Sequence, residues 1–375
     1  MEITKQVKLD ISHMPTISVC MIVKNEEKNL ENLLPILYKS VDEIIIVDTG
    51  STDNTVKEAM KYTINVYKYT WENDFSKARN ESLKHATKDY VLWLDADDVI
   101  TKQDIAKLRF HLMKNPNTAV FVNLVDKKLK VEHRARQLRV FPNHQGIEFR
   151  KRVHEQVSFS IEEKGIQYSN SDICIFHFGY SSKELAKEKS ERNLMLLFYE
   201  LGEDSEDFFT NLEIGKTYLG LGMLKDAMMF TEKCIRLVEE DTKKSINREH
   251  AFLPFYTYFT ICHSENKFKE AFTVLERNKE RFSDNPLYKL AMGELYFRFK
   301  KYEEAYEELS ILDGGKIPVG IVPVNQNVIR MLSNLYMLSS LYIGDLDTAE
   351  SCIKRFINDP DFKIKRRGDM FDGVS

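Results

Sequence analysis

Three acidic residues follow directly after an apolar stretch in the segment YVLWLDADDVI, residues 90–100. The apolar half predicts a strand that is buried on both faces, because such strands lose the alternation of polar and apolar residues. Asp95, Asp97 and Asp98 would then lie at the carboxyl end of that strand, where open α/β sheets bind their ligands. Carboxylates one residue apart can both reach a hard divalent cation, so the segment predicts an Mg²⁺ or Mn²⁺ site.

The same acids have a second interpretation, as the start of the next helix. Asp97 or Asp98 could cap that helix, and Thr101 with Asp104 three residues later forms a capping-box pattern before an apolar helical stripe. From this segment alone both interpretations stay open, and the rest of the chain has to decide between them.

The first half of the chain alternates strand and helix patterns. Runs rich in β-branched and aromatic residues predict strands, and apolar residues spaced three or four apart predict the helices between them. We expect strands at 16–23, 43–48, 64–69, 90–95 and 118–125, and helices at 25–40, 51–63, 74–87 and 101–115. This series predicts a mostly parallel sheet with right-handed crossovers, in which the loops after the strands gather along one edge.

The loops expected at that edge carry the polar residues. KNEE follows the first strand and DTGSTDNT follows the second. The patterns GxxxxGK[ST] and GxGxxG are both absent from them, which excludes a phosphate cradle of the P-loop or dinucleotide-binding type. Glu26 and Asp48 could instead accept hydrogen bonds from a nucleoside, and Lys77 and Arg79 are the cations available for a diphosphate.

Four segments of the first half resemble the family 2 glycosyltransferases with a GT-A nucleotide-sugar fold: ISVCMIVKNEEKNLENLL, VDEIIIVDTGSTDNTV, WENDFSKARNESLKHAT and DYVLWLDADD. The resemblance implies that Asp95-Ala96-Asp97 is the DxD motif, with Asp97 as the metal ligand, and it leaves Asp98 as the helix cap. The donor-binding residues that it implies are Val23, Asn25, Glu26, Asp48, Ser51, Lys77, Arg79, Asp95 and Ala96.

The segment after the DxD element is predicted to extend the sheet and to carry acceptor-side residues. Glu155 and His177 are candidates for proton transfer and leaving-group stabilisation, although a lone histidine on an apolar strand is more often a core residue. RVHEQV, HFGY and KSERNLMLL resemble the family 2 enzymes with helical-repeat domains, which include the glycocin peptide S-glycosyltransferases. That resemblance implies Glu155 as the base of an inverting displacement and His177 as a further metal or diphosphate ligand. It also places Arg136, Arg139, His154 and Tyr180 near the acceptor or the phosphates.

From Lys183 onward the strand patterns vanish, and small residues recur at tetratricopeptide (TPR) spacing. Gly215 and Ala227 mark one unit, and Gly293 and Ala305 mark another. Small residues recur because paired helices must approach closely. The predicted organisation is an N-terminal extension (1–15), an α/β GT-A domain (16–180), a linker helix (181–205) and an all-α TPR-like domain (206–375).

The composition indicates an ordinary globular protein. With 375 residues and a net charge of −4 the chain is long enough for two domains, and it does not suggest a nucleic-acid partner. The sequence lacks an apolar run of the ~20 residues that span a bilayer and opens without a signal-peptide core, so we expect no stable membrane insertion and a cytoplasmic location. Its five cysteines lack CxxC spacing, which favours reduced core thiols over zinc ligands.

Together the residues and the resemblance imply a metal-dependent transferase. The expected reaction moves a sugar from a nucleotide-sugar donor, such as a UDP-hexose, to a Cys, Ser or Thr side chain of a peptide such as a bacteriocin precursor. The helical repeats would bind the peptide or join two copies of the chain into a homodimer. Two alternatives stay open: an acceptor that is a cell-envelope glycan or lipid, and a non-catalytic TPR binding scaffold.

Overall fold

The computed structural model describes residues 14–126, 133–178, 183–242, 246, 248–315 and 326–357. Tyr180 and most of the expected N-terminal extension therefore lie outside the described residues. The contacts divide the chain into two compact units, Met1–Ala186 and Lys187–Ser375. The domain limits that we derived from sequence patterns stay predictions.

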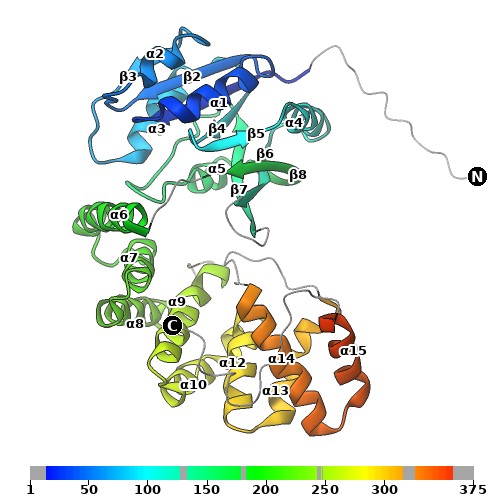
Figure 1. The fold of residues 1–375 in the computed structure, drawn as a ribbon. Helices are drawn as coiled ribbons and strands as arrows, with labels where there is room; N and C mark the ends of the chain where they lie inside the picture. Colours follow the sequence, from blue (N-terminus) through cyan, green and yellow to red (C-terminus); the bar gives the residue numbers. More distant parts are fainter. Residues whose placement is uncertain are drawn as a thin grey trace, which may run out of the picture. The chain divides into compact units, whose positions relative to one another are not determined.

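An eight-stranded sheet organises the first unit (Figure 1). The strands lie in the order β3-β2-β1-β4-β7-β6-β8-β5. β1 to β4 pair in parallel, as the alternation of strands and helices predicted, whereas β7 pairs antiparallel with both β4 and β6, and β5 pairs antiparallel with β8. The strands are β1 (Ile17–Val23), β2 (Glu43–Asp48), β3 (Val66–Lys68), β4 (Tyr90–Leu94), β5 (Asp98–Ile100), β6 (Thr118–Asp126), β7 (His133–Pro142) and β8 (Gln167–His177).

Helices cover both faces of this sheet, which explains the continuous apolar runs of its central strands. In β1, Val19 and Met21 pack with the leucines of α1 and α4, whereas Cys20 between them packs toward α3 and α5 on the opposite face. The helices of this unit are α1 (Glu27–Leu37), α2 (Thr55–Ala59), α3 (Phe75–Lys84), α4 (Lys102–Lys114) and α5 (Ser158–Glu163). The predicted α/β class of the first half is confirmed.

The carboxyl ends of the parallel strands meet at one edge. Val23 at the end of β1 lies beside Asp48 at the end of β2, and β4 flanks β1 on its other side. The two loops that follow β1 and β2 are joined by hydrogen bonds. The backbone N–H of Asn25 donates to Ser51 Oγ over 2.9 Å, and that of Thr52 donates to Asn25 Oδ1 over 2.8 Å. The loops predicted to bind the donor therefore form one connected surface.

The prediction that Asp98 caps a helix is wrong. Thr101 is the N-cap of α4, and its Oγ1 accepts from the Asp104 backbone N–H over 3.0 Å, as the capping-box pattern predicted. Asp98 instead begins β5, a short strand whose register places it opposite His177 of β8. The carboxylate turns inward because Asp98 and Ile100 lie on the buried face of this strand.

The elements described in the second unit are all helices, as predicted. Four helix pairs pack side by side within it: α7 with α8, α9 with α10, α12 with α13, and α14 with α15 (Figure 1). One buried alanine marks the second helix of each pair: Ala227, Ala271, Ala305 and Ala349. The helices are α6 (Lys183–Glu203), which begins just before this unit, α7 (Phe208–Gly220), α8 (Leu224–Glu240), α9 (Arg248–Ser264), α10 (Phe268–Glu276), α11 (Lys279–Phe282), α12 (Pro286–Arg298), α13 (Tyr302–Leu309), α14 (Gln326–Ile343) and α15 (Leu346–Ile357), with a 3₁₀ turn at Ser310–Gly315.

None of the helices in the described ranges combines the length and the apolar character that a membrane span requires.

The close approach of paired helices makes Gly293 a position where an added methyl group should be costly. A Cβ on this residue would lie 2.5 Å from Cγ of Leu309, a side chain that is itself fully buried. We expect Gly293→Ala to lower the free energy of unfolding of the helical unit by about 1–3 kcal/mol through overpacking. Urea unfolding followed by far-ultraviolet circular dichroism measures it.

Gly220 provides the matched control. It also lies in a helix, but a Cβ there would have no atom within 4 Å. Gly220→Ala should leave stability unchanged or raise it by up to about 1 kcal/mol. Equal destabilisation by both variants would contradict the close packing of α12 on α13.

Candidate active site

Arg79 connects the DxD element with the predicted base. Helix α3, capped by Asp74, brings Arg79 beneath the edge of the sheet, where its Nη2 lies 2.7 Å from Asp95 Oδ1 and its Nε lies 2.6 Å from Glu155 Oε1. The guanidinium also lies 4.4 Å from the ring centre of Trp93. Burial would lower the pKa of Arg79, but the charges of Asp95 and Glu155 outweigh burial and raise it.

Arg139 forms the second bridge of the site. It projects from β7, which pairs with β4, and its side chain is almost fully buried. Its guanidinium lies 3.1 Å from Asp98 Oδ2, 3.4 Å from Asp95 Oδ2 and 3.7 Å from the ring centre of Trp93. Burial would raise the pKa of Asp95, but the adjacent charges of Arg79 and Arg139 lower it well below the usual range.

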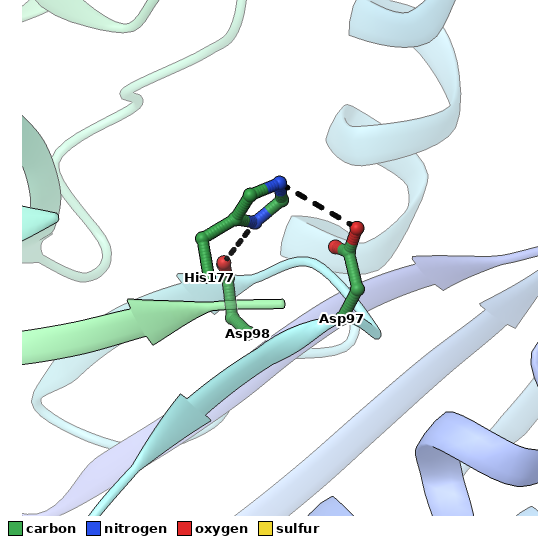
Figure 2. Close-up of side chains that lie close together, drawn as sticks. All are labelled: Asp97, Asp98 and His177. Carbon is green, nitrogen blue, oxygen red and sulfur yellow. Dashed lines mark hydrogen bonds and ion pairs between the residues drawn. The ribbon is translucent and has the colours of Figure 1, made fainter. Parts of the chain in front are cut away.

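Next to Arg139, the side chains of Asp97, Asp98 and His177 lie close together (Figure 2). His177 Nδ1 lies 3.0 Å from Asp98 Oδ1, and His177 Nε2 lies 3.6 Å from Asp97 Oδ2. The hydrogen bond to Asp98 raises the pKa of His177, and burial raises the pKa of Asp97. One potential ligand atom from each residue lies within 4.8 Å of the others. Carboxylate oxygens suit Mg²⁺ and Mn²⁺, and an imidazole nitrogen is a common ligand of transition metals.

Glu155 is positioned by a segment that α3 holds in place. The Asn80 side chain donates to the Phe149 carbonyl over 2.9 Å and accepts from the Phe149 N–H over 2.7 Å. The segment turns sharply after this anchor, since Lys151 and His154 have φ angles of 81° and 54°. Glu155 therefore reaches Arg79, whereas His154 is exposed to solvent.

The ion-pair cluster that results contains Asp95, Asp97, Asp98, Glu155, Arg79, Arg139 and His177. Four carboxylates face two guanidiniums, so the cluster carries two excess negative charges when His177 is neutral. A divalent cation would balance them. The sequence analysis proposed six of these residues as site residues. The structure brings them together from α3, β7, β8 and the segments that follow β4 and β7.

The remaining predicted residues have other surroundings. Lys77 pairs with Glu72 over 2.8 Å, and Arg136 donates to Asn170 over 3.0 Å. Asp48 accepts from the Ser51 N–H over 3.2 Å, inside its own turn. The other predicted members of the donor surface are Val23 and Ala96, which are buried, and Glu26, which accepts from Asn29 over 2.6 Å. The roles assigned to all these residues stay predictions.

Two members of the site escaped the sequence analysis. Trp93 was interpreted only as part of the apolar strand, and Asp98 only as a cap. Trp93 is anchored by its Nε1–H, which donates to the Leu138 carbonyl over 2.9 Å, and its ring lies against both guanidiniums. The sequence did contain a signal for both residues, because a tryptophan and a third acid rarely occur together at the end of one strand. Their partners, however, follow only from the pairing of β4 with β7 and of β5 with β8.

The buried bridge at Arg139 should be important for stability. Arg139→Met would remove the guanidinium beside the fully buried Asp98 and leave Asp95 with Arg79 alone, and removal of one partner from a buried ion pair costs about 3–5 kcal/mol. Urea unfolding followed by tryptophan fluorescence measures this unit alone, because the two tryptophans, Trp71 and Trp93, both lie in it.

Arg136→Met is the matched control, on the same strand. The Arg136 side chain is exposed, and substitutions at such positions usually change stability by less than about 0.5 kcal/mol. An equal loss from the two substitutions would contradict the buried bridge.

The fold and the site define the class. A mixed α/β sheet with an Asp-Ala-Asp element at the carboxyl end of a central strand, followed by TPR-like helix pairs, is a GT-A type domain joined to a helical-repeat region. Residues 18–188 match the family model described as Glycosyl transferase family 2. The chain therefore contains a family 2 glycosyltransferase domain.

Individual relatives and solved structures are similar to parts of this chain. A TPR repeat-containing protein of Synechococcus elongatus is 30% identical over 230 residues, which cover 60% of this chain and 57% of the relative. The SPbeta prophage-derived glycosyltransferase SunS of Bacillus subtilis is 27% identical over 198 residues, which cover 49% of this chain and 45% of SunS. The chain thus spans about half the length of these relatives. Among solved structures, S. aureus TarS has a TM-score of 0.43 at 17% identity and covers 66% of this chain and 55% of its own.

Proposed function

We propose that this chain is an inverting, metal-dependent glycosyltransferase that moves a hexose from a UDP-linked donor to a Cys, Ser or Thr side chain of a peptide. The family 2 domain supports the transfer of a sugar. The connected loops after β1 and β2 and the acidic end of β4 offer the donor a surface at the ligand-binding edge of the sheet.

The observation that carries the proposal is the small number of side-chain contacts that the Asp97 carboxylate makes. Among the described residues, the side chain that lies closest to its carboxylate is His177, whose Nε2 is 3.6 Å away, whereas Asp95 and Asp98 are held by arginine side chains. Asp97 and His177 therefore have ligand atoms available on the open side of a cluster with excess negative charge. We assign the divalent cation, Mg²⁺ or Mn²⁺, to these two residues. When bound, it supplies positive charge for the diphosphate of the donor.

Glu155 is the group that we assign to proton transfer. In the proposed step the acceptor sulfur or oxygen attacks the anomeric carbon, the carboxylate of Glu155 takes the acceptor proton, and the bond between that carbon and the diphosphate oxygen breaks. UDP leaves with the bonding electrons. Because the acceptor attacks from the face opposite UDP, the configuration at the carbon inverts. Arg79 holds Oε1 of Glu155 over 2.6 Å and thereby keeps the carboxylate oriented.

A peptide acceptor is supported by the helical repeats and by the resemblance to the glycocin enzymes. TPR-like arrays commonly present extended surfaces that bind other chains. A second acceptor class is favoured by a different match, since 113 residues are 29% identical to a poly-β-1,6-N-acetyl-D-glucosamine synthase of Staphylococcus aureus. That match covers only 26% of this chain and 26% of the synthase.

The test is a transfer assay with the full-length chain. Purified protein is incubated with UDP-glucose, UDP-galactose or UDP-N-acetylglucosamine, with Mn²⁺ or Mg²⁺, and with peptides that contain a single Cys, Ser or Thr. Mass spectrometry should show a peptide heavier by one sugar, and chelation should prevent it. Sugar transfer only to an envelope glycan or lipid would favour the second acceptor class, and an absence of both transfer and donor hydrolysis would favour a binding scaffold.

A further inference from the structure

Asp98 belongs to the group of three potential metal ligands, yet its surroundings differ from those of Asp97. Its side chain is fully buried, whereas the Asp97 carboxylate is 20% exposed. Each oxygen of Asp98 is already an acceptor. Oδ2 accepts from the Asp95 backbone N–H over 3.0 Å and forms an ion pair with Arg139 Nη1 over 3.1 Å, and Oδ1 faces His177 Nδ1 over 3.0 Å.

These contacts determine which nitrogen of His177 carries the proton. An ionised carboxylate accepts hydrogen bonds but donates none. The short contact to Asp98 Oδ1 therefore requires the proton on Nδ1, and in the neutral ring Nε2 keeps its lone pair. Nε2 is the atom that faces Asp97, at 3.6 Å. Ligand atoms about 2.1 Å from one octahedral cation lie about 3.0–4.2 Å apart, so this spacing suits two ligands of the same ion.

The existing contacts of Asp98 disfavour direct binding of a cation to its carboxylate. On Oδ1 it would lie beside the Nδ1–H proton, and Oδ2 is occupied by a backbone N–H and a guanidinium. The strand pairing also favours a contact between Asp98 and His177, because β5 and β8 hold these two residues directly opposite each other. A carboxylate behind a ligating histidine fixes the orientation and tautomer of the ring.

We infer that Asp98 is a positioning residue and not a metal ligand: it holds His177 with the proton on Nδ1 and the Nε2 lone pair beside Asp97. The inference rests on the proposed function, since it assigns the cation to Asp97 and His177. It also assigns Arg139 a part, because its guanidinium lies 3.1 Å from Oδ2 of Asp98 and places a positive charge beside that buried carboxylate.

The first measurement is the tautomer of His177 in the metal-free wild-type chain. Two-bond ¹H–¹⁵N correlation spectra of ¹⁵N-histidine-labelled protein, recorded well above the raised pKa of this ring, distinguish a protonated nitrogen from an unprotonated one. The signals of His177 are those missing from the His177→Asn variant. We expect a proton on Nδ1 and none on Nε2. A ring with its proton on Nε2 would overturn the inference. Because the tautomer is measured in the wild-type chain, this test does not depend on whether an Asp98 variant folds.

The second measurement compares Mn²⁺ affinities by electron paramagnetic resonance. Asp98→Asn keeps an oxygen for His177 but loses the charge, so Mn²⁺ should bind about 10–100-fold more weakly. Asp97→Asn should remove detectable binding, and Asp172→Asn, at an exposed position of β8, should bind as the wild type does. Wild-type affinity in Asp98→Asn, or a loss as complete as in Asp97→Asn, would overturn the positioning role.

The two measurements also separate this inference from the proposed function. A wild-type chain that binds Mn²⁺ and shows the Nδ1–H tautomer but transfers no hexose would contradict the proposed reaction and support the role of Asp98. Absence of Mn²⁺ binding by the wild type would contradict both the metal dependence and the inference.

Discussion

Asp97→Asn is expected to remove both Mn²⁺-dependent binding of UDP and transfer of the sugar. The carboxylate of Asp97 is the acidic group of the cluster whose oxygens are not held by an arginine. A bound cation contributes several kcal/mol to the stabilisation of a developing charge, so its loss should lower the rate by at least about 10³-fold. Titration calorimetry with UDP and Mn²⁺ measures the binding, and mass spectrometry of the peptide measures the transfer.

The matched control for this prediction is Asp172→Asn. Asp172 is exposed on β8, the strand that also carries His177, and undergoes the same chemical change. Circular dichroism should show that both variants keep the wild-type secondary structure. Unchanged UDP binding with Mn²⁺ in Asp97→Asn would show that the cation is held elsewhere.

Glu155→Gln is expected to lower kcat by about 10²–10⁴-fold, because a positioned general base contributes about that factor and an amide cannot take the acceptor proton. The affinity for the donor should change little. In the wild type, Arg79 Nε lies 2.6 Å from Glu155 Oε1. The amide oxygen of the new side chain can still accept from this nitrogen, so the loop that carries residue 155 should keep its place. Initial rates over a range of donor concentrations separate kcat from KM.

An exposed glutamate supplies the control for this prediction. Glu31 lies on the solvent side of α1, and Glu31→Gln should turn over at the wild-type rate. Near-normal turnover by Glu155→Gln would show that another residue is the base. His154 would be the first to test, because it directly precedes Glu155 in the chain and is exposed. A rise in KM without a fall in kcat would instead show that Glu155 binds a substrate.

Local patterns were sufficient for most of the α/β unit. Strands such as 43–48 could be predicted because a strand covered on both faces has to be apolar throughout, and β2 occupies the same residues. The start of α4 could be predicted because Thr101 Oγ1 accepts from the free N–H of Asp104 within one turn, while the Thr101 hydroxyl donates to the Asp104 carboxylate. The pairing order was not predictable in the same way. β7 lies between β4 and β6 through contacts that no local pattern records.

The short strand β5 shows where local reasoning failed. Three residues, Asp98–Ile100, are too few for a periodic signal, and an aspartate before a helix is a common cap. Its strand conformation depends on β8, which follows it in the chain by more than sixty residues (98 against 167). The carboxylate is stable in the core only because Arg139 and His177 lie beside it.

By itself the sequence determined the fold class and indicated the edge of the sheet where the candidate site lies and the acidic residues of the DxD element, because local residue patterns identify buried strands and capped helices. The tertiary structure alone decided how the charges are distributed. Arg79 and Arg139 come from different elements and lie beside one tryptophan, where they hold Asp95 and Asp98 and leave Asp97 with His177. Burial is the physical reason, because a charge removed from water requires a partner, and strand pairing decides which partner is within reach.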